Sequence, residues 1–297
     1  NRTEREIRNE MGILQEKQLI QVFQKGMILT ELGHIVLEKL KLNFYEISGL
    51  AEKEKQLANH LNIQSVSIVP GDVDIDPSAK SLLGKEASYI LGERATPKSI
   101  VAVTGGSSVA TLSQHLIEAK PFNTMKFVSA RGSMRSDVSL QANTLVSQFA
   151  KKCGGQYHTL LLPEFLSEQA YTLMMEEPIV KETVQLYDDT NIVIHGIGTA
   201  SEMGKLRNMS PTEYEQLINK GAVGEAFGYY FDAMGNVVYR IQTVGIQIEQ
   251  VKKSELILAI AGGKSKAMAI EAYFKIAAKH TVLITDEGAA DEILKHV

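Results

Sequence analysis

The sequence predicts an α/β fold whose main part is a doubly wound, mainly parallel sheet. From Ser65 onward, short apolar runs alternate with amphipathic stretches, which is the pattern of parallel strands covered by helices on both faces. Several of the apolar runs lead directly into loops rich in glycine and small residues. Residues 1–48 have a different texture, so we expect a small first domain followed by a larger one over residues 49–297.

The elements of the larger domain follow from hydrophobic periodicity. The predicted strands are residues 66–69, 100–103, 126–129, 157–162, 192–195, 256–261 and 281–285. The clearest helical stretches are residues 140–152, 166–187 and 266–279. In sheets of this kind ligands bind beyond the carboxyl ends of the strands, where the glycine-rich loops are expected to meet.

The first domain reads as a helix, a β-hairpin and a second helix. Thr3 and Glu6 have the spacing of a capping box, and Ile7, Met11 and Leu14 then fall on one helical face. Residues 19–23 and 27–29 form two short apolar runs around a glycine turn, and a helix is predicted over residues 31–42. This order is that of the second half of a winged helix-turn-helix, so we expect the chain to begin inside that domain.

Arg5 and Arg8 would then lie on the recognition helix and Lys25 at the tip of the wing. The alternative is a small α+β unit with a solvated arginine face, and residues 1–55 carry equal numbers of basic and acidic residues. Apolar residues at spacings of three and four between Leu37 and Ile47 predict a linker helix that pairs with another subunit.

Bulk composition limits the classes of protein. The chain has 297 residues, 44 % hydrophobic and 22 % charged, with a formal net charge of −4, so its overall charge does not indicate nucleic acid. The single Cys153 excludes an intramolecular disulfide and suits a reducing compartment. Without an apolar run of about 20 residues or a signal peptide, we expect a soluble cytoplasmic protein.

The loops after the strands have the chemistry of a phosphate site. The stretch Thr104–Ser108 combines two glycines, which let the backbone approach a ligand, with hydroxyl donors at the start of a helix. Arg131 and Arg207 offer planar donors for phosphate, and Lys264 and Lys266 bracket another helix start. More than one cation suits a ligand with two phosphates. The sequence lacks the Walker A pattern, a complete dinucleotide fingerprint and a His/Cys cluster with metal spacing.

These motifs together resemble the SorC-type bacterial transcription regulators. The resemblance spans nearly the whole chain, in the stretches "KGMILTELG", "SIVAVTGGSS", "SLQAN", "VIHGIGTA", "GEAFGYYFDAMG", "AGGKSKAMAIEAYF" and "VLITDEGAA". It implies an effector domain that shares its fold with phosphosugar isomerases and coenzyme A transferases. It also implies a repressor of glycolytic genes whose affinity for operator DNA is modulated by fructose-1,6-bisphosphate, and which acts as a homo-oligomer, a dimer or a tetramer.

The same resemblance implies the site residues. One phosphate would be held by the loop, and the remaining groups would line the pocket around the sugar and the second phosphate; the set is Thr104, Gly105, Gly106, Ser107, Ser108, Arg131, Gln141, Arg207, Glu225 and Lys266. The family pattern favours Lys266 over Lys264. Operator contacts would come from Thr3, Arg5, Arg8 and Lys25.

An enzyme remains the alternative to a sensor. A phosphosugar isomerase needs a carboxylate or a histidine at a carbon-bound proton, and Glu225 and Asp286 are the loop candidates. Coenzyme A transfer needs a glutamate nucleophile, which the sequence does not mark. A half winged helix has no evident use in an isomerase. Together with the resemblance, this favours a sensor with no catalytic residues, no cofactor and no metal.

Overall fold

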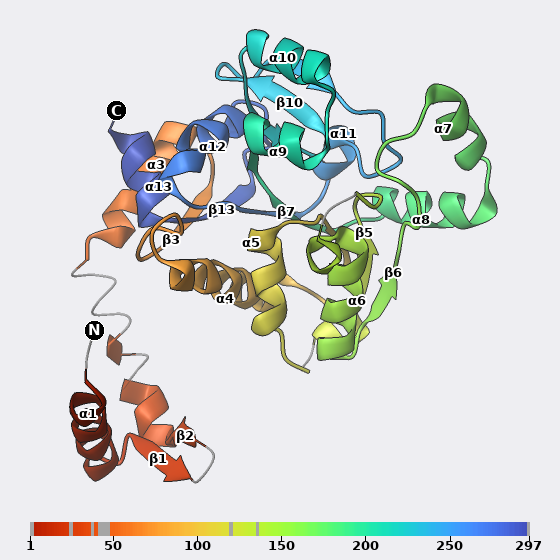
Figure 1. Cartoon of the computed structure of the whole chain (residues 1–297). Coiled ribbons are helices and arrows are strands. Elements are labelled where there is room, and N and C mark those ends of the chain that lie inside the picture. Colours follow the sequence, from red (N-terminus) through yellow and green to blue (C-terminus); the bar gives the residue numbers. More distant parts are fainter. Residues whose placement is uncertain are drawn as a thin grey trace. The chain divides into compact units, whose positions relative to one another are not determined.

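The computed structural model describes residues 3–23, 26–36, 39–40, 48–118, 121–134 and 137–295. The chain divides into two compact units, Asn1–Lys53 and Glu54–Val297, each of which is described by itself (Figure 1). None of the helices in the described ranges is both long and apolar enough to cross a membrane.

The first unit begins with α1 (Glu4–Glu16), which starts where the capping pattern predicts. The backbone N–H of Glu6 donates to Thr3 Oγ1 at 3.4 Å, and the Thr3 backbone N–H donates to Glu6 Oε2 at 2.7 Å. The reciprocal pair satisfies two donors that a helix start otherwise leaves without partners. The apolar face of this helix is largely exposed: Ile7 is 48 % and Leu14 is 40 % exposed.

A β-hairpin follows, made of β1 (Ile20–Phe23) and β2 (Gly26–Leu29) in antiparallel register. The hydroxyl of Thr30 accepts from the Gly33 backbone N–H at 2.9 Å, which caps the next helix, described at residues 31–36 and 39–40. The predicted order of helix, hairpin and helix is therefore present. Lys25 and most of the predicted linker helix lie outside the described residues.

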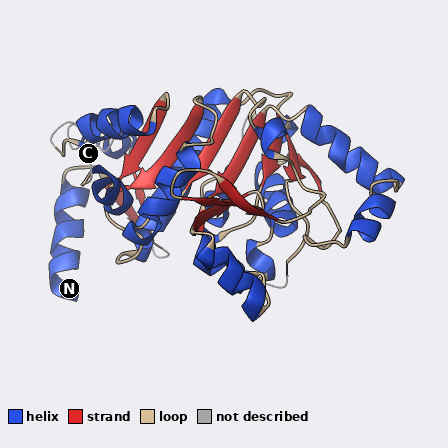
Figure 2. Cartoon of the chain, turned by 90° about the horizontal axis from the view of Figure 1, so that it is seen from above, coloured by secondary structure: helices blue, strands red, loops and turns tan. Residues whose placement is uncertain are grey.

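The second unit is built on a seven-stranded parallel sheet with the strand order β3-β13-β12-β7-β4-β5-β6. The strands are β3 (Ser65–Val69), β4 (Ile100–Val103), β5 (Lys126–Ser129), β6 (Gln156–His158), β7 (Ile192–Gly196), β12 (Leu256–Ile260) and β13 (Thr281–Asp286). Figure 2 shows them side by side with helices on both faces of the sheet. Double coverage explains the continuous apolar runs, because every residue of β12 and of β13 is buried.

Helices and short 3-10 turns connect these strands. The helices are α3 (Leu50–Leu61), α4 (Pro77–Arg94), α5 (Ser107–Ala110), α6 (Ala142–Cys153), α7 (Glu168–Met174), α8 (Pro178–Asp188), α11 (Ile248–Val251), α12 (Ala267–Phe274) and α13 (Glu287–Leu294). The 3-10 turns are η1 (Thr111–Gln114), η2 (Phe122–Thr124), η3 (Val138–Leu140) and η4 (Lys264–Lys266). A continuous apolar core joins α4, α5 and α6 to the middle of the sheet, and Cys153 is buried in it.

A second, four-stranded antiparallel sheet was not expected from the sequence. Its order is β11-β10-β9-β8, with β8 (Gly198–Thr199), β9 (Ala222–Ala226), β10 (Tyr229–Asp232) and β11 (Val237–Arg240). Helices α9 (Ala200–Leu206) and α10 (Pro211–Asn219) lie between β8 and β9 in the chain. The β9–β10 hairpin turns at Phe227 and Gly228, whose φ angles of 55° and 81° match the tight turn preferred in hairpins.

Three predicted elements differ clearly from the structure. The helix predicted over residues 266–279 is shorter, because α12 covers only Ala267–Phe274 and Lys266 belongs to η4. The stretch 166–187 is two helices, because Pro178 lacks a backbone N–H and is placed at the first turn of α8. The predicted strand 157–162 reduces to the three residues of β6. In the segment directly after β6, Pro163 forms an isolated bridge with Ser133. This segment also carries Glu164, which lines the functional site described below.

Candidate functional site

A cavity of about 400 Å³ opens at the carboxyl ends of the central strands of the seven-stranded sheet. Its volume is within the range of small-molecule sites. The cavity brings together all ten residues that the sequence predicts for the effector: Thr104, Gly105, Gly106, Ser107, Ser108, Arg131, Gln141, Arg207, Glu225 and Lys266. They come from β9 and from loops that follow β4, β5 and β12, and from the ends of α9 and η3.

The loop after β4 uses its two glycines differently. A Cβ on Gly105 would lie 2.6 Å from the Leu140 carbonyl oxygen, so only glycine fits there. Gly106 has a φ of 123° and nothing within 4 Å of a Cβ position. The Gly106 backbone N–H donates to the Leu140 carbonyl at 2.9 Å, which ties the loop to η3. Ser107 and Ser108 then form the first turn of α5. The backbone N–H groups of a first turn have no carbonyl partner within the helix.

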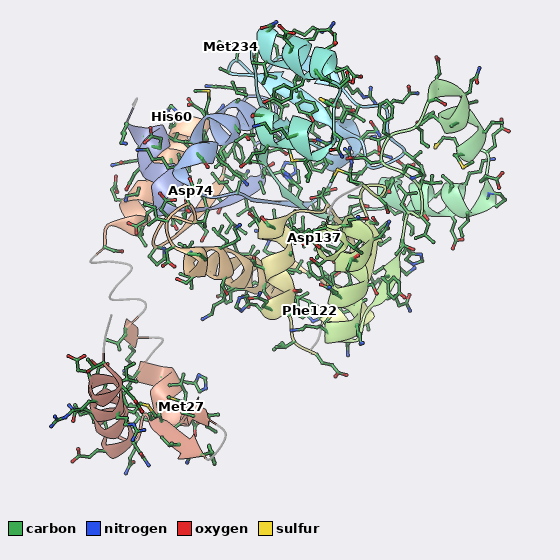
Figure 3. All side chains as sticks on the ribbon, in the orientation of Figure 1. Met27, His60, Asp74, Phe122, Asp137 and Met234 are labelled. Atoms are coloured by element: carbon green, nitrogen blue, oxygen red, sulfur yellow. The ribbon has the colours of Figure 1, made fainter. Side chains whose placement is uncertain are left out.

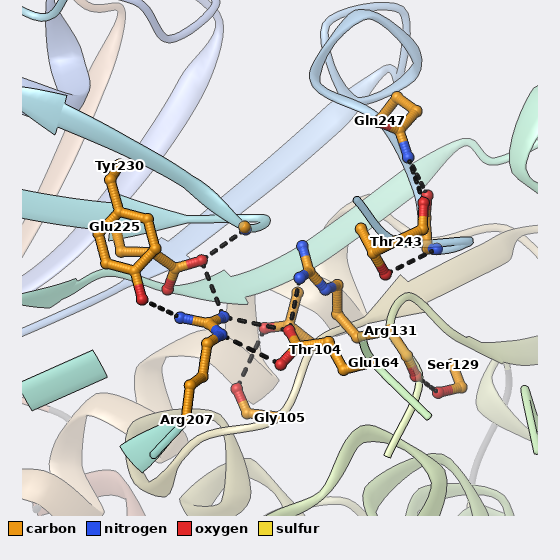
Figure 4. Close-up of polar contacts among 12 residues, drawn as sticks. Thr104, Gly105, Ser129, Arg131, Glu164, Arg207, Glu225, Tyr230, Thr243 and Gln247 are labelled. Carbon is orange, nitrogen blue, oxygen red and sulfur yellow. Dashed lines mark hydrogen bonds and ion pairs between the residues drawn. The ribbon is translucent and has the colours of Figure 1, made fainter. Parts of the chain in front are cut away.

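Four charged side chains form a buried network on the opposite wall (Figure 4). Glu164 Oε1 accepts from Arg131 Nη2 at 2.5 Å and from Arg207 Nη2 at 3.1 Å. Glu164 Oε2 accepts from Arg207 Nε at 3.1 Å. Arg207 also donates to Glu225 Oε1 at 3.1 Å and to Tyr230 Oη at 2.9 Å. Glu225 and Tyr230 are direct cross-strand neighbours on β9 and β10, so the second sheet positions this end of the network.

Electrostatic attraction keeps Glu164 and Arg207 ionised. Burial disfavours the carboxylate of Glu164, but attraction to Arg131 and Arg207 outweighs this effect and holds its pKa below the ordinary value. Burial likewise disfavours the charged form of Arg207, yet Glu225 and Glu164 raise its pKa. Two cations and two anions therefore face one another in a site that solvent scarcely reaches.

Arg131 has donors left over. It is 6 % exposed, and its Nε and Nη1 atoms have no hydrogen-bond partner among the residues that the structure describes. A Cβ on Gly228 would lie 2.7 Å from Arg131 Nη2, so the glycine of the hairpin turn makes room for the guanidinium. Leaving buried charged donors without partners costs free energy, and an anion in the cavity would remove that cost.

Lysines supply further positive charge. Lys266 lines the cavity, where burial and the nearby Lys80 lower its pKa and Glu202 opposes them. Lys264 is exposed and pairs with Glu292 at 3.3 Å, away from the lining residues. Two further polar residues at the cavity were not predicted from the sequence. Lys80 Nζ donates to Ser107 Oγ at 3.3 Å. For Glu164 the only available signal was its position just after the predicted strand 157–162.

Gln141, which was also predicted from the sequence, donates from Nε2 to the Met134 carbonyl at 2.8 Å. Asp137 caps the start of η3, which ends just before Gln141, and Asp137 also lines the cavity. Figure 3 shows the Asp137 side chain near α5 and α6.

The two candidate bases for an enzyme, Asp286 and Glu225, are both engaged in hydrogen bonds within the protein, and the histidine that lies on β7 is enclosed as well. Asp286 is fully buried and accepts backbone N–H bonds from Val73, Gly263 and Ala289. His195 is fully buried against Tyr273. Glu225 is held by Arg207 and the Gly228 backbone N–H. Within the described ranges, no group of three or more His, Cys, Asp or Glu residues is arranged to hold a metal ion.

The candidate DNA-contacting residues lie on the first unit. Arg5 and Arg8 are exposed on α1, and Arg8 Nη2 pairs with Glu4 Oε1 at 2.6 Å. Thr3 is exposed and uses its hydroxyl in the helix cap.

Comparison with known proteins adds the family. Residues 45–295 match the family described as "Putative sugar-binding domain", and residues 1–43 match the "CggR N-terminal DNA binding domain". The chain is 40 % identical over 293 residues to the central glycolytic genes regulator of Bacillus subtilis, covering 99 % of this chain and 86 % of that protein. Identity to the regulator of the same name from Priestia megaterium is 38 %, again over 99 % of this chain and 86 % of that protein.

A solved structure of a related regulator has the same fold. The "putative SorC family transcriptional regulator from Enterococcus faecalis" superposes with a TM-score of 0.76 at 39 % identity, covering 82 % of this chain and 99 % of that one. These matches confirm the α/β fold preceded by a DNA-binding domain and identify a regulator rather than an enzyme, which sets aside the isomerase alternative. The chain belongs to the SorC family of transcriptional regulators, in which a DNA-binding domain is joined to a sugar-binding domain.

Proposed function

We propose that this regulator represses glycolytic genes and that its cavity binds a sugar carrying two phosphates, fructose-1,6-bisphosphate. The observation that carries the proposal is Arg131, whose two unpartnered buried donors belong to a cavity that also contains a glycine and hydroxyl loop. Buried guanidinium donors without partners cost free energy, and an anion in the cavity would remove that cost with charge-assisted hydrogen bonds. The names of the relatives support the choice of glycolytic genes.

The two phosphates would be held at separate places in the cavity. The hydroxyl and backbone N–H groups of Ser107 and Ser108 hold one of them, with Lys80 at 3.3 Å from Ser107 adding charge. Arg131, Arg207 and Lys266 serve the second phosphate, and Gln141 and Glu225 face the sugar hydroxyls. A ligand with a single phosphate satisfies only one of these groups, so we expect it to bind more weakly.

The coupling to DNA follows the division of the chain. We assign operator binding to residues 1–48, including Thr3, Arg5, Arg8 and Lys25, and effector binding to residues 49–297. A homo-oligomer, a dimer or a tetramer, presents several DNA-binding domains, and the bisphosphate shifts the population between two arrangements of them. Operator binding weakens because the effector binds more tightly to the arrangement that has the lower affinity for the operator.

Thermal unfolding and calorimetry on the full chain test the assignment. The panel is fructose-1,6-bisphosphate, fructose-6-phosphate, glucose-6-phosphate, dihydroxyacetone phosphate and inorganic phosphate, with product analysis on the same samples. At a hundredfold excess over its dissociation constant, the true effector stabilises the native state by about 2.7 kcal/mol. Selective stabilisation by the bisphosphate without turnover is the expected result. Equal stabilisation by inorganic phosphate, or none by any member, contradicts the proposal.

A further inference from the structure

Glu164 occupies the place where a phosphate would meet the two arginines of the cavity. Its side chain is 5 % exposed, and every hydrogen bond that its carboxylate accepts in the described part of the chain comes from Arg131 or Arg207. We propose that Glu164 competes internally with the effector for these arginines and thereby sets the effector concentration at which the regulator responds. This inference rests on the proposed function and adds a residue that determines affinity.

The backbone holds Glu164 in position. Its N–H donates to the Ser133 carbonyl at 2.8 Å, and the Ser133 N–H donates to the Leu162 carbonyl at 2.7 Å. Gly132 allows this close approach, because a Cβ there would lie 2.6 Å from the Leu162 oxygen. The loop that carries Arg131 is thus fastened to the segment that carries Glu164. With the backbone fastened, the carboxylate and the arginines can separate only by rotation of their side chains.

Charge makes Glu164 a competitor. Arg131 and Arg207 face Glu164 and Glu225, so the network carries no net charge before an anion enters. A phosphate on Arg131 then lies within a few ångströms of a second anion in a site of low effective dielectric, where like charges repel strongly. Binding of the effector has to separate Glu164 from at least one arginine or to bear this repulsion. Either requirement weakens the apparent affinity.

Glu225 differs from Glu164 although both pair with Arg207. Glu225 Oε1 also accepts the Gly228 backbone N–H at 2.5 Å, so this carboxylate closes the β9–β10 turn and keeps a partner when Arg207 moves. The carboxylate of Glu164 has no such backbone donor among its hydrogen bonds. Removal of its charge therefore leaves the hairpin intact and changes mainly the balance at the arginines.

The test is calorimetric binding of fructose-1,6-bisphosphate and of inorganic phosphate to the full chain and to Glu164→Gln. The amide retains an acceptor for the arginines and removes the negative charge. We expect Glu164→Gln to bind the bisphosphate about tenfold more tightly, the equivalent of about 1.4 kcal/mol. The matched control is Glu168→Gln, which removes one charge from the exposed start of α7 and leaves the affinity unchanged.

The variant Glu164→Asp decides the question if the amide variant does not fold. Its carboxylate is one methylene shorter on the same fixed backbone, so it competes less well and binding tightens by a few-fold. Tightening is a result that a purely structural role cannot produce. Unchanged or weaker binding of both ligands in the folded variant overturns the inference.

The inorganic phosphate arm separates this inference from the proposed function. If Glu164→Gln tightens phosphate binding but neither protein prefers the bisphosphate, Glu164 does compete with anions, and the proposed effector is wrong. If the wild type prefers the bisphosphate and Glu164→Gln binds the bisphosphate more weakly, the proposed effector is supported and the competing role of Glu164 is wrong. Absence of binding by either ligand to either protein overturns both.

Discussion

Tyr273 donates its hydroxyl hydrogen to His195 Nε2 across 3.1 Å, in the buried layer between the sheet and α12. Nδ1 of the same ring donates to the Gly196 carbonyl at 3.0 Å, because a carbonyl can only accept. Burial lowers the pKa of His195 from 6.5 to about 4, and the bond to Gly196 only partly opposes this shift. At neutral pH the ring is therefore uncharged, its single proton lies on Nδ1, and Nε2 accepts from Tyr273.

The neutral histidine predicts an acid-sensitive fold. The unfolded chain binds a proton at His195 at a higher pH than the folded chain does, so this group's contribution to stability is fully present above about pH 6.5 and is lost as pH falls toward 4. The loss amounts to about 3 kcal/mol, on the scale of about 1.4 kcal/mol per pKa unit. Urea unfolding between pH 4 and pH 8 measures it. His195→Gln should flatten this dependence, whereas His158→Gln on β6 should retain it.

Arg131→Gln should abolish high-affinity binding of the bisphosphate. The substitution removes the unpartnered Nε and Nη1 donors and the charge, and bonds to charged groups contribute about 1.5–3 kcal/mol each. We expect an affinity loss of about a hundredfold by calorimetry. Arg94→Gln, at the last turn of α4, serves as the control. Full affinity in Arg131→Gln would remove the main support for the phosphate site.

Lys266 and Lys264 provide a matched pair two residues apart. Lys266 lines the cavity, and Lys264 pairs with Glu292 on the surface. Lys266→Gln should weaken the bisphosphate about tenfold to a hundredfold through the lost charge. Lys264→Gln should change the affinity less than twofold, because exposed ion pairs contribute little. The reverse order would move the second phosphate to the outside of η4.

Gly105→Ala should destabilise the second unit. Its Cβ would lie 2.6 Å from the Leu140 carbonyl and 3.2 Å from the Ala142 nitrogen, so the loop has to move away from η3. We expect a loss of about 1–3 kcal/mol in the free energy of unfolding, measured by urea denaturation. Gly106→Ala differs in its cause, because the space around the Cβ is open and only the backbone conformation, φ 123° and ψ 153°, costs energy, about 1–3 kcal/mol. Unchanged stability in Gly105→Ala would show that close packing at Gly105 is unimportant.

Binding of the full chain to duplex DNA should weaken steeply with salt. Arg5→Gln should reduce the slope of log affinity against log salt by about 0.9, the value for one phosphate contact. Arg8→Gln should have a smaller effect, because Arg8 is paired with Glu4 in the free protein. Fluorescence anisotropy from 50 to 200 mM salt measures the slopes. A flat response in the wild type would exclude phosphate contacts by α1.

The strands of the main sheet were predictable because they are buried on both faces. Their apolar runs end where they meet loops, so residues 100–103 and 126–129 were located with both boundaries correct. The second sheet was not, because its strands are short and interrupted by glycine and aromatic residues. Its hairpin depends on a positive φ at Phe227, which sequence patterns rarely indicate.

The ten site residues were assigned from loop chemistry and family resemblance, and the structure brings all of them to one cavity. Glu164 and Lys80 escaped prediction. Neither stands in a glycine-rich loop, and their proximity to Arg131 and Ser107 comes from segments distant in the sequence.

The sequence by itself determined the parallel sheet, the helix cap at Thr3 and the positions of the glycine-rich loops, because hydrophobic period, capping and glycine content are local properties. Only the tertiary structure decided which charges meet. Arg207 lies against Glu164 and Glu225 because the β9–β10 hairpin and the segment after β6 converge at one edge of the sheet. Burial there removes the screening by water, so pairing between distant residues determines how many arginine donors remain for an anion.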